Sequence, residues 1–298
     1  MADHAIEVAR LDARLVTALA WTDLWLAEQN ARLAEGDAGR RRDLESAAQA
    51  RLEEGAVARI DVVRATADAA RATADARAAE SATRGAAARL AGTLGADPST
   101  QTIATSGEPL GASVPAELDV EAVLAAHPLA RRAEASSYAA EETTEHDHRS
   151  RWPRLGVQIS DWIHRSNDAH DVRLLLTMDI PLFDEPRIER SESARDQAHV
   201  EQAAVITRLR ASVLAMHADY LAVAERCRAQ DESIVPMMRE AAELAREGYE
   251  EGSVDLTTTL AAAQALADAE RSLVGCVADR ARAAARLDHA EGRVDDWN

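Results

Sequence analysis

The sequence predicts a mainly α-helical protein built from long antiparallel coiled-coil helical hairpins, together with one β-hairpin. Aromatic residues make up only 3% of the 298 residues, and much of the 47% hydrophobic content is alanine. That composition favours long, closely packed helices over a thick globular core. Helical periodicity covers most of the chain and is interrupted twice by the motif Glu-Glu-Gly. A separate stretch of about 25 residues alternates with a period of two, which is typical of strands.

The first predicted element is a helical hairpin over residues 1–94, with its turn near Gly55. Glycine costs about 1 kcal/mol relative to alanine in a helix interior. It is common just after a helix C-terminus, where the chain takes left-handed dihedral angles. We therefore interpret the first Glu-Glu-Gly as the tip of a hairpin, with arms of about 40 residues that would be about 60 Å long.

The second predicted helical hairpin, residues 182–298, has its turn near Gly252 and repeats the first. A single sequence offset (252 − 55 = 197) aligns the two glycines. Without gaps it also aligns Val16 with Val213, Ala18 with Ala215, Leu24 with Leu221, Glu28 with Glu225, Glu35 with Glu232, Arg42 with Arg239 and Val57 with Val254. Duplication of one helix–turn–helix unit accounts for these matches.

Between the two hairpins we predict a linker over 95–117, an ascending helix over 118–153 and the β-hairpin over 154–181. The linker is rich in glycine, proline, serine and threonine, as loops are. His127-Pro128 is predicted to bend or restart the helix, and Trp152-Pro153 to end it, because the residue before a proline disfavours the helical conformation.

Both strands of the predicted β-hairpin carry apolar residues on one face, and a polar turn, "HRSNDAHD", joins them. The alternating residues are Leu155, Val157 and Ile159 in the first strand and Val172, Leu174, Leu176, Met178 and Ile180 in the second. The pattern fits a soluble hairpin that covers a helical core. It also fits a tilted membrane strand pair, with Trp152 and Trp162 near the interfaces. Membrane strands must close into a barrel, so one hairpin per chain would require a cyclic oligomer.

Charge and motifs exclude several classes of function. All 34 basic residues are arginine, and 52 acidic residues bring the formal net charge to −18, which argues against a nucleic-acid partner. No glycine-rich phosphate loop, nucleophile–base arrangement or zinc spacing occurs, so we predict neither an enzyme nor a cofactor. The N-terminus lacks the features of a signal peptide, and no stretch approaches the length of a transmembrane helix.

Histidine and cysteine residues raise the question of metal or redox chemistry. His146 and His148 lie among acids, but residues i and i+2 do not share a helix face, so we expect no metal site. Cys227 and Cys276 lie at nearly equal distances before and after Gly252 (252 − 227 = 25 and 276 − 252 = 24). We expect buried free thiols at similar heights in the hairpin, with a disulfide as the alternative in an oxidising compartment.

Four segments occur in an order that resembles one family. "TMDIPLFDEPRIERSESARDQA", with Pro181-Leu182-Phe183-Asp184 as its core, is similar to a passage from barrel strand to descending helix. "ARLEEGAVARIDVVRATADAARA" and "AREGYEEGSVDLTTTLAAAQAL" are similar to two periplasmic tips, and "AHPLARRAEASSYAAEE" to the start of a second repeat. Nearly the whole chain therefore resembles the TolC-like outer-membrane efflux family (outer membrane factors), most closely its heavy-metal-efflux branch.

The resemblance implies a homotrimer in the outer membrane, with a periplasmic helical barrel and a β-barrel pore in the lipid. The tips would meet the hairpin of a periplasmic membrane-fusion adaptor, which joins the channel to an inner-membrane pump. The adaptor-binding tip residues would be Gly55, Ala56, Val57, Gly252, Ser253 and Val254, and the apolar strand residues named above would face lipid. Asp61 and Asp255, with Asp268 farther along, would line the tunnel mouth; the alternative is a solvated helix face.

One departure from the family concerns its first half. Family protomers contribute two β-hairpins each, whereas this sequence predicts one, and it starts at the descending helix of the first repeat. We therefore expect an N-terminally truncated sequence from which the signal peptide is missing. The predicted function is a passive channel subunit of a tripartite efflux system that exports metal cations or small toxic compounds. The alternative is a soluble coiled-coil scaffold whose tips bind a protein partner without forming a pore.

Overall fold

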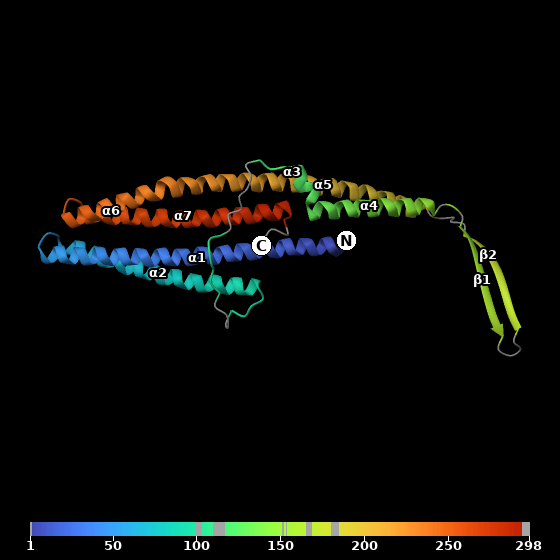
Figure 1. Ribbon diagram of the computed structural model, residues 1–298, viewed down its shortest axis with the longest axis horizontal. Coiled ribbons are helices and arrows are strands. Elements are labelled where there is room, and N and C mark those ends of the chain that lie inside the picture. Colours follow the sequence, from blue (N-terminus) through green and yellow to red (C-terminus); the bar gives the residue numbers. More distant parts are fainter. Residues whose placement is uncertain are drawn as a thin grey trace. The chain divides into compact units, whose positions relative to one another are not determined.

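A computed structural model of the protein describes residues 2–98, 103–109, 117–150, 152, 154–164, 169–179 and 185–293. The predicted fold class is confirmed, because long helices and one antiparallel β-hairpin make up the secondary structure (Figure 1). The chain divides into two compact units. One, here called the strand-bearing unit, joins Met1–Val8 to Glu121–Ala211. The other, the helical layer, joins Ala9–Val120 to Ser212–Asn298.

Helices α4 (Pro128–Arg149) and α5 (Glu185–Ala229) pack antiparallel in the strand-bearing unit. The Thr144 hydroxyl donates to the Ser191 carbonyl at 3.0 Å, and His199 lies 3.0 Å from Glu141. The short helix α3 (Val120–Ala126) precedes α4. α4 starts at Pro128, where the missing N–H costs nothing, and His127 caps it by accepting the Leu129 N–H at 3.1 Å.

The β-hairpin consists of β1 (Arg154–His164) and β2 (Ala169–Asp179), paired from Arg154↔Asp179 to His164↔Ala169 without a bulge. This register sets Leu155 opposite Met178, Val157 opposite Leu176 and Ile159 opposite Leu174. Side chains opposite one another in an antiparallel pair lie on the same face. The six apolar residues therefore form one continuous face, as the alternation predicted.

The helical layer contains α1 (Ala2–Glu53), α2 (Arg59–Thr93), the end of α5, η1 (Gln230–Ile234), α6 (Val235–Glu251) and α7 (Leu256–Glu291). Contacts fix the order in which these helices lie side by side. α2 packs on α1 through Thr66 and Glu45, α1 packs on α7 through Asp23 and Arg282, and α7 packs on α6 through Thr259 and Ala245 (Figure 1). The order across the layer is α2–α1–α7–α6.

Alanine keeps the helices of the layer close. Leu24 of α1 is fully buried against Ala86 and Leu90 of α2. Nearer the turns, Ala48 and Ala65 pack with Leu44, Tyr249 and Leu256. Short side chains on facing helices allow the backbones to approach, so a chain with few aromatic residues still buries a continuous seam. The linker is held on α1, where Glu28 accepts the Thr105 N–H at 3.0 Å.

The internal repeat extends into the backbone geometry. Gly55 and Gly252 both have positive φ, at 74° and 86°. The starts of α2 and α7, at Arg59 and Leu256, keep the offset that aligns these glycines (256 − 59 = 197). A second pair of positive-φ glycines, Gly95 and Gly292, keeps it too (292 − 95 = 197), at φ 69° and 71°. Each repeat therefore places its two left-handed glycines at the same spacing (95 − 55 = 292 − 252).

The expectation of free thiols is wrong, because Cys227 and Cys276 form a disulfide with a Cα–Cα distance of 5.5 Å. Nearly equal distance from Gly252 brings the two residues to the same height, as the sequence suggested. The Ala-rich seam between α5 and α7 then brings the backbones into bonding range. Both cysteines are buried.

Just beyond the disulfide the helix changes its pitch at η1, a single π turn that leads into α6. Pro236 lies in the first turn of α6. Proline lacks an N–H and its ring collides with the carbonyl four residues earlier. The π turn accommodates both effects without ending the helix. Among the described helices, none has an apolar stretch long enough to cross a lipid bilayer.

Candidate functional site

The first tip is a compact turn between α1 and α2. Gly55 donates to the Leu52 carbonyl at 2.9 Å, and Ala56 donates to the Arg51 carbonyl at 2.8 Å. These bonds satisfy carbonyls at the end of α1 in the manner of a glycine-based C-cap. The left-handed φ of Gly55 explains the residue, since a side chain there would be strained.

The second tip depends on two glycines. Gly252 ends α6 with left-handed angles, and both Ser253 and Val254 donate to the Gly248 carbonyl, at 2.8 and 3.0 Å. A Cβ at Gly248 would lie 2.5 Å from the Val254 side chain. Gly248 is therefore a packing glycine that lets Val254 fold back onto α6. Sequence reasoning did not separate this role from that of the turn glycine.

Arg51 connects the two tips. Its guanidinium donates to the carbonyl of Tyr249 and lies 4.8 Å from the centre of the Tyr249 ring, a cation–π contact. It also lies beside Gly252, where an added Cβ would be 3.1 Å from its Nη2 atom. The Tyr249 hydroxyl is buried without a hydrogen-bond partner, and burial raises its pKa. Arg51 thus holds both turns at the same level.

Four of the six expected docking residues are exposed, namely Gly55, Ala56, Gly252 and Ser253. Val57 and Val254 are half-buried, and Val254 rests against Gly248. The accessible surface of each tip is therefore mostly backbone and small side chains. Such a surface lets a partner approach the backbone of each turn closely, because no large side chain stands in the way.

Two of the three acidic residues near the tips, Asp255 and Asp268, have local partners. Asp255 caps α7, where it accepts the Thr258 N–H at 3.0 Å and the Thr258 hydroxyl at 2.9 Å. These hydrogen bonds lower the pKa of the Asp255 carboxyl. Asp268 pairs with Arg271 at 2.7 Å, and Asp61 is half-buried in the first turn of α2. A helix-capping role therefore accompanies any role of Asp255 at a tunnel mouth.

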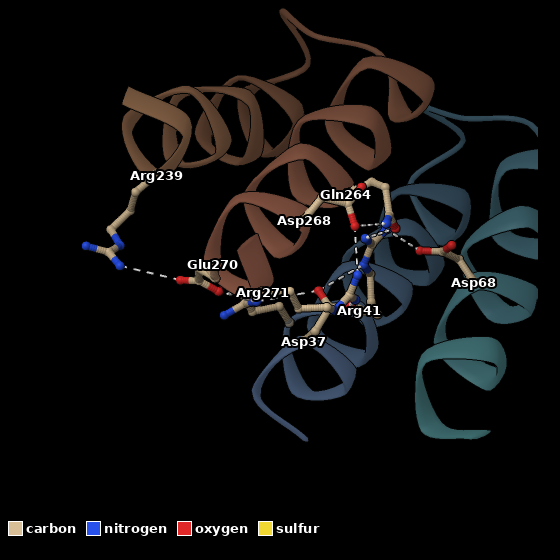
Figure 2. Close-up of polar contacts among 9 residues, drawn as sticks. Asp37, Arg41, Asp68, Arg239, Gln264, Asp268, Glu270 and Arg271 are labelled. Atoms are coloured by element: carbon tan, nitrogen blue, oxygen red, sulfur yellow. Dashed lines mark hydrogen bonds and ion pairs between the residues drawn. The ribbon is translucent and has the colours of Figure 1, made fainter. Parts of the chain in front are cut away.

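A polar belt crosses the whole layer above the tips (Figure 2). At its centre, the buried Arg41 contacts Asp37, Asp68 and Gln264. Arg271 and Arg40 approach Asp37 at 3.9 and 3.5 Å. The belt continues through Asp268 and through Glu270, which contacts Arg239 of α6. Belt residues come from α2, α1, α7 and α6. Their directional contacts fix the register of these four helices relative to one another, which packing between alanines alone would not specify.

The β-hairpin carries the expected apolar residues on one exposed face. Leu155, Val157, Ile159, Leu174, Leu176 and Met178 have exposed fractions between 57% and 73%. Opposite them lie Gly156, Gln158, Ser160, Arg173, Leu175 and Thr177. Val172 lies in β2 and pairs with Asp161, and Ile180 lies outside the described residues, as does Pro181-Leu182-Phe183-Asp184. The hairpin is two-faced, and its apolar face is largely exposed.

The chain thus combines two helical tips at one level with a two-faced β-hairpin. A comparison with known protein families places this combination. Residues 120–293, 174 of the 298 residues, match the outer membrane efflux protein family. The chain belongs to this family. The match begins at α3 and ends just after α7, so it contains the β-hairpin, the second tip and the disulfide. No curated protein matches the sequence.

Solved structures resemble the chain over more than the residues of the family match. The outer-membrane channel OprN superposes with a TM-score of 0.83 at 19% identity, over 98% of this chain and 68% of OprN. CusC gives 0.83 at 16% identity, over 97% of this chain and 70% of CusC. The outer membrane protein VceC from Vibrio cholerae gives 0.79 at 17% identity, over 98% and 72%. These likenesses show that the efflux protein has the fold of these channels, including the first repeat.

Metal-binding side chains do not gather in the described part of the efflux protein, where no group of three or more His, Cys, Asp or Glu could hold an ion. His148 lies 3.0 Å from Glu192 of α5. The functional residues that sequence reasoning missed are Arg51, Gly248 and the belt residues Asp37 and Arg41. Arg51 and Arg41 contact Tyr249, Asp68 and Gln264, which lie far away in the sequence. Local signals were limited to the i, i+4 spacing of Asp37 and Arg41 and to the spacing of Gly248 before Gly252.

Proposed function

We propose that the protein is a channel subunit of a tripartite efflux system and assembles as a homotrimer in the outer membrane. The observation that carries the proposal is the presence, in one chain of this family, of two exposed tips held level by Arg51 and of a β-hairpin with one bare apolar face. Helices would form the periplasmic tunnel and strands would contribute to the pore. The protein would act as a passive conduit, with energy supplied by the pump.

The exposed tips are proposed to receive the hairpin of a periplasmic membrane-fusion adaptor. Gly55, Ala56, Val57, Gly252, Ser253 and Val254 are the proposed contact residues. Docking would compete with the Arg51–Tyr249 contact, which joins the two hairpins beside the apolar packing of Leu44 and Ala48 on Tyr249. Release of that contact would let the tips separate and widen the tunnel entrance. Asp61 and Asp255 would then face passing solute and favour cations.

The disulfide supports a periplasmic location for the helical layer. Cys227 and Cys276 are buried and bonded, and disulfides persist in oxidising compartments such as the periplasm. The proposed substrates are metal cations or small toxic compounds, as in the heavy-metal-efflux branch that the sequence resembles. The likeness to CusC in fold is compatible with this branch.

The test is to place charge on each face of the β-hairpin. Leu174→Arg with Leu176→Arg puts two charges on the apolar face, and each arginine near the bilayer midplane costs about 2–4 kcal/mol. Membrane assembly should be lost, as measured by fractionation and by conductance in planar bilayers. Gln158→Arg, on the opposite exposed face of β1, is the control and should assemble normally. Recovery of the unaltered chain and of both variants in the soluble fraction, in equal amounts, would contradict the channel and favour a soluble scaffold.

A further inference from the structure

Two histidine–glutamate pairs join α4 to α5 in the strand-bearing unit. His148 of α4 lies 3.0 Å from Glu192 of α5, and His199 of α5 lies 3.0 Å from Glu141 of α4. The pairs are reciprocal, because each helix supplies one histidine and one glutamate. Their spacing is the same on both helices (148 − 141 = 199 − 192). A spacing of seven residues places both pairs on one side of each helix, about 10 Å apart along its axis.

The contact between α4 and α5 buries few apolar side chains. On α4 the buried residues are Pro128, Ser137, Thr144 and Asp147. In residues 185–211, the part of α5 that belongs to the strand-bearing unit, the buried residues are Ile188 and Ser191. Apolar burial stabilises helix contacts in proportion to the area removed from water. Where that area is small, polar contacts account for a larger share of what holds the two helices together.

Two other polar contacts hold these helices near the strands. The Thr144 hydroxyl donates to the Ser191 carbonyl at 3.0 Å, and the Arg187 guanidinium lies 3.6 Å from the Asp147 carboxylate. Neither a hydroxyl nor a guanidinium titrates near neutral pH. These contacts therefore keep the end of α4 that leads into β1 attached to the start of α5.

The histidine–glutamate pairs, in contrast, contain groups that change charge near neutral pH. Imidazole takes up a proton between about pH 5 and pH 8. A protonated ring makes a charge-assisted hydrogen bond to a carboxylate, which is roughly twice as strong as a bond between neutral groups. A neutral ring can still donate from Nε2, but the attraction between opposite charges is lost. The four side chains are between 42% and 47% exposed, so water can exchange protons with both rings.

The other charged groups at this contact do not replace the imidazolium charge. Glu145 pairs with Arg149 on α4 at 2.7 Å, and Asp196 pairs with Arg195 on α5 at 2.7 Å. The hydrogen bond with Asp196, and then the charges of the two paired glutamates, raise the pKa of Arg195. One arginine that already has an aspartate partner therefore faces both glutamates. When the two rings are neutral, acids outnumber arginines here, and like charges push α4 and α5 apart.

We infer that the two histidine–glutamate pairs form a clamp that closes α4 on α5 in mild acid and loosens above neutral pH. Each imidazolium strengthens its pair, and this contribution is lost as the rings release their protons. The contacts of Thr144 and Arg187 remain, so the helices separate mainly beyond Glu141 and His199, on the side away from the strands. Because α4 leads into β1 and α5 follows β2, the clamp determines how firmly the base of the β-hairpin is held.

Spin labels on two exposed positions measure this separation. Ser136→Cys on α4 and Ala203→Cys on α5 lie beyond the Glu141–His199 pair, and the native cysteines are already bonded to one another. Labelled full chain is diluted into unlabelled chain in detergent, so that distances within one chain are measured. The ratio of short to long distances should fall about fivefold from about pH 5 to about pH 8, because each exposed ion pair shifts such an equilibrium about two- to threefold.

Histidine variants show whether the pairs cause the change. His148→Gln with His199→Gln should give the distances of the higher pH at both pH values, since glutamine donates a hydrogen bond but carries no charge. His148→Arg with His199→Arg should give the short distance at both, because arginine stays charged. His146→Gln is the matched control, as His146 is an exposed histidine of α4 that belongs to neither pair. It should behave like the unaltered chain.

Two results would overturn the clamp. One is the same distance distribution in the unaltered chain at both pH values. The other is a pH-dependent distribution that persists in the double glutamine variant, because other groups would then be responsible. The clamp lies within two helices of one unit and acts whether or not the strands enter lipid. A chain that conducts but shows no distance change would remove the clamp alone, and a chain that shows the change but neither assembles in membranes nor conducts would remove the channel alone.

Discussion

Arg41 illustrates how one buried charge fixes the position of several helices. Its side chain is 3% exposed and contacts Asp37, whose side chain is 8% exposed, and Asp68. A buried ion pair adds little to stability relative to apolar packing, but removing one partner leaves a charge uncompensated. Near Arg41 the helices pack mainly through alanine, which does not favour one position of a helix over another. The directional hydrogen bonds and ion pairs of Arg41 therefore determine how the helices are aligned.

We predict that Arg41→Met lowers the free energy of unfolding by about 3 kcal/mol, because Asp37 stays buried with only the weaker contacts to Arg40 and Arg271. Arg40→Met is the matched control. Its side chain is 41% exposed, and exposed ion pairs contribute about 1 kcal/mol or less. Denaturant unfolding of both variants measures the difference. Equal losses would show that the belt is a surface network without a structural role.

Tyr249 provides the opposite case, a buried polar group without a partner. Its hydroxyl makes no hydrogen bond, while its ring packs with Leu44, Ala48 and Leu256. An unsatisfied buried hydroxyl costs about 1–3 kcal/mol. Tyr249→Phe should therefore keep the ring and raise the free energy of unfolding by about 1 kcal/mol. A lower stability would mean that the hydroxyl has a partner in the assembled channel, and unfolding in detergent would reveal it.

Asp255 gives the second tip a dependence on pH. Hydrogen bonds from Thr258 lower the pKa of the Asp255 carboxyl in the folded protein. Its contribution to folding is present above its unfolded pKa, about 3.9, and is lost as the pH falls through the lowered folded value. Amide exchange at Thr258 should therefore speed up in strong acid. Asp255→Asn also caps helices but does not titrate, so the same acid-dependent change in that variant would contradict the assignment.

At the scale of elements, the second hairpin combines a covalent cross-link with an irregular segment of helix. The disulfide joins α5 to α7, and only a few residues later η1 and Pro236 interrupt the regular α-helix. The described part of the first hairpin has neither feature. Bending of the second hairpin should therefore concentrate between the disulfide and the tip, which is the part that an adaptor would reach.

The disulfide should account for a large part of the stability of this hairpin. The two cysteines are 49 residues apart, and closing a loop of that length restricts the unfolded chain by about 4 kcal/mol in the chain-entropy treatment. We predict a loss of about 2–4 kcal/mol in Cys227→Ala with Cys276→Ala, measured by denaturant unfolding. The unaltered protein under reducing conditions should approach the variant. No difference between reducing and oxidising conditions would mean that the bond does not form.

Much of each element could be predicted from the sequence, because the signals are local. Alternation gave the strand faces, and the glycines after Glu-Glu gave the turns. The partners of Arg51 and Arg41 could not be predicted, because they depend on which helices are neighbours. Even aligned residues differ: Leu24 is fully buried and Leu221 is 40% exposed, while Val16 is 53% exposed and Val213 is fully buried. α1 lies between two helices, whereas the second repeat places the matching helix at an edge.

At the scale of the whole molecule, the order of segments along the chain carried the family resemblance, and the family match confirmed it. The closer resemblance to a heavy-metal-efflux branch stays a prediction. The formal net charge of −18 is not spread evenly, since α2 has six arginines and four acidic residues, whereas α6 has two arginines and five glutamates. An overall charge therefore described the molecule less well than the placement of a few residues did.

The equal spacing of the paired glycines limits how this protein can change. Gly55 and Gly95 are as far apart as Gly252 and Gly292, and Arg51 joins the two turns. Inserting one residue in a single arm would move its turn by about 1.5 Å and rotate it by about 100° relative to the other. Length changes in this protein should therefore be tolerated only in matched pairs, in both repeats at once and in whole heptads. The two repeats therefore constrain each other's length.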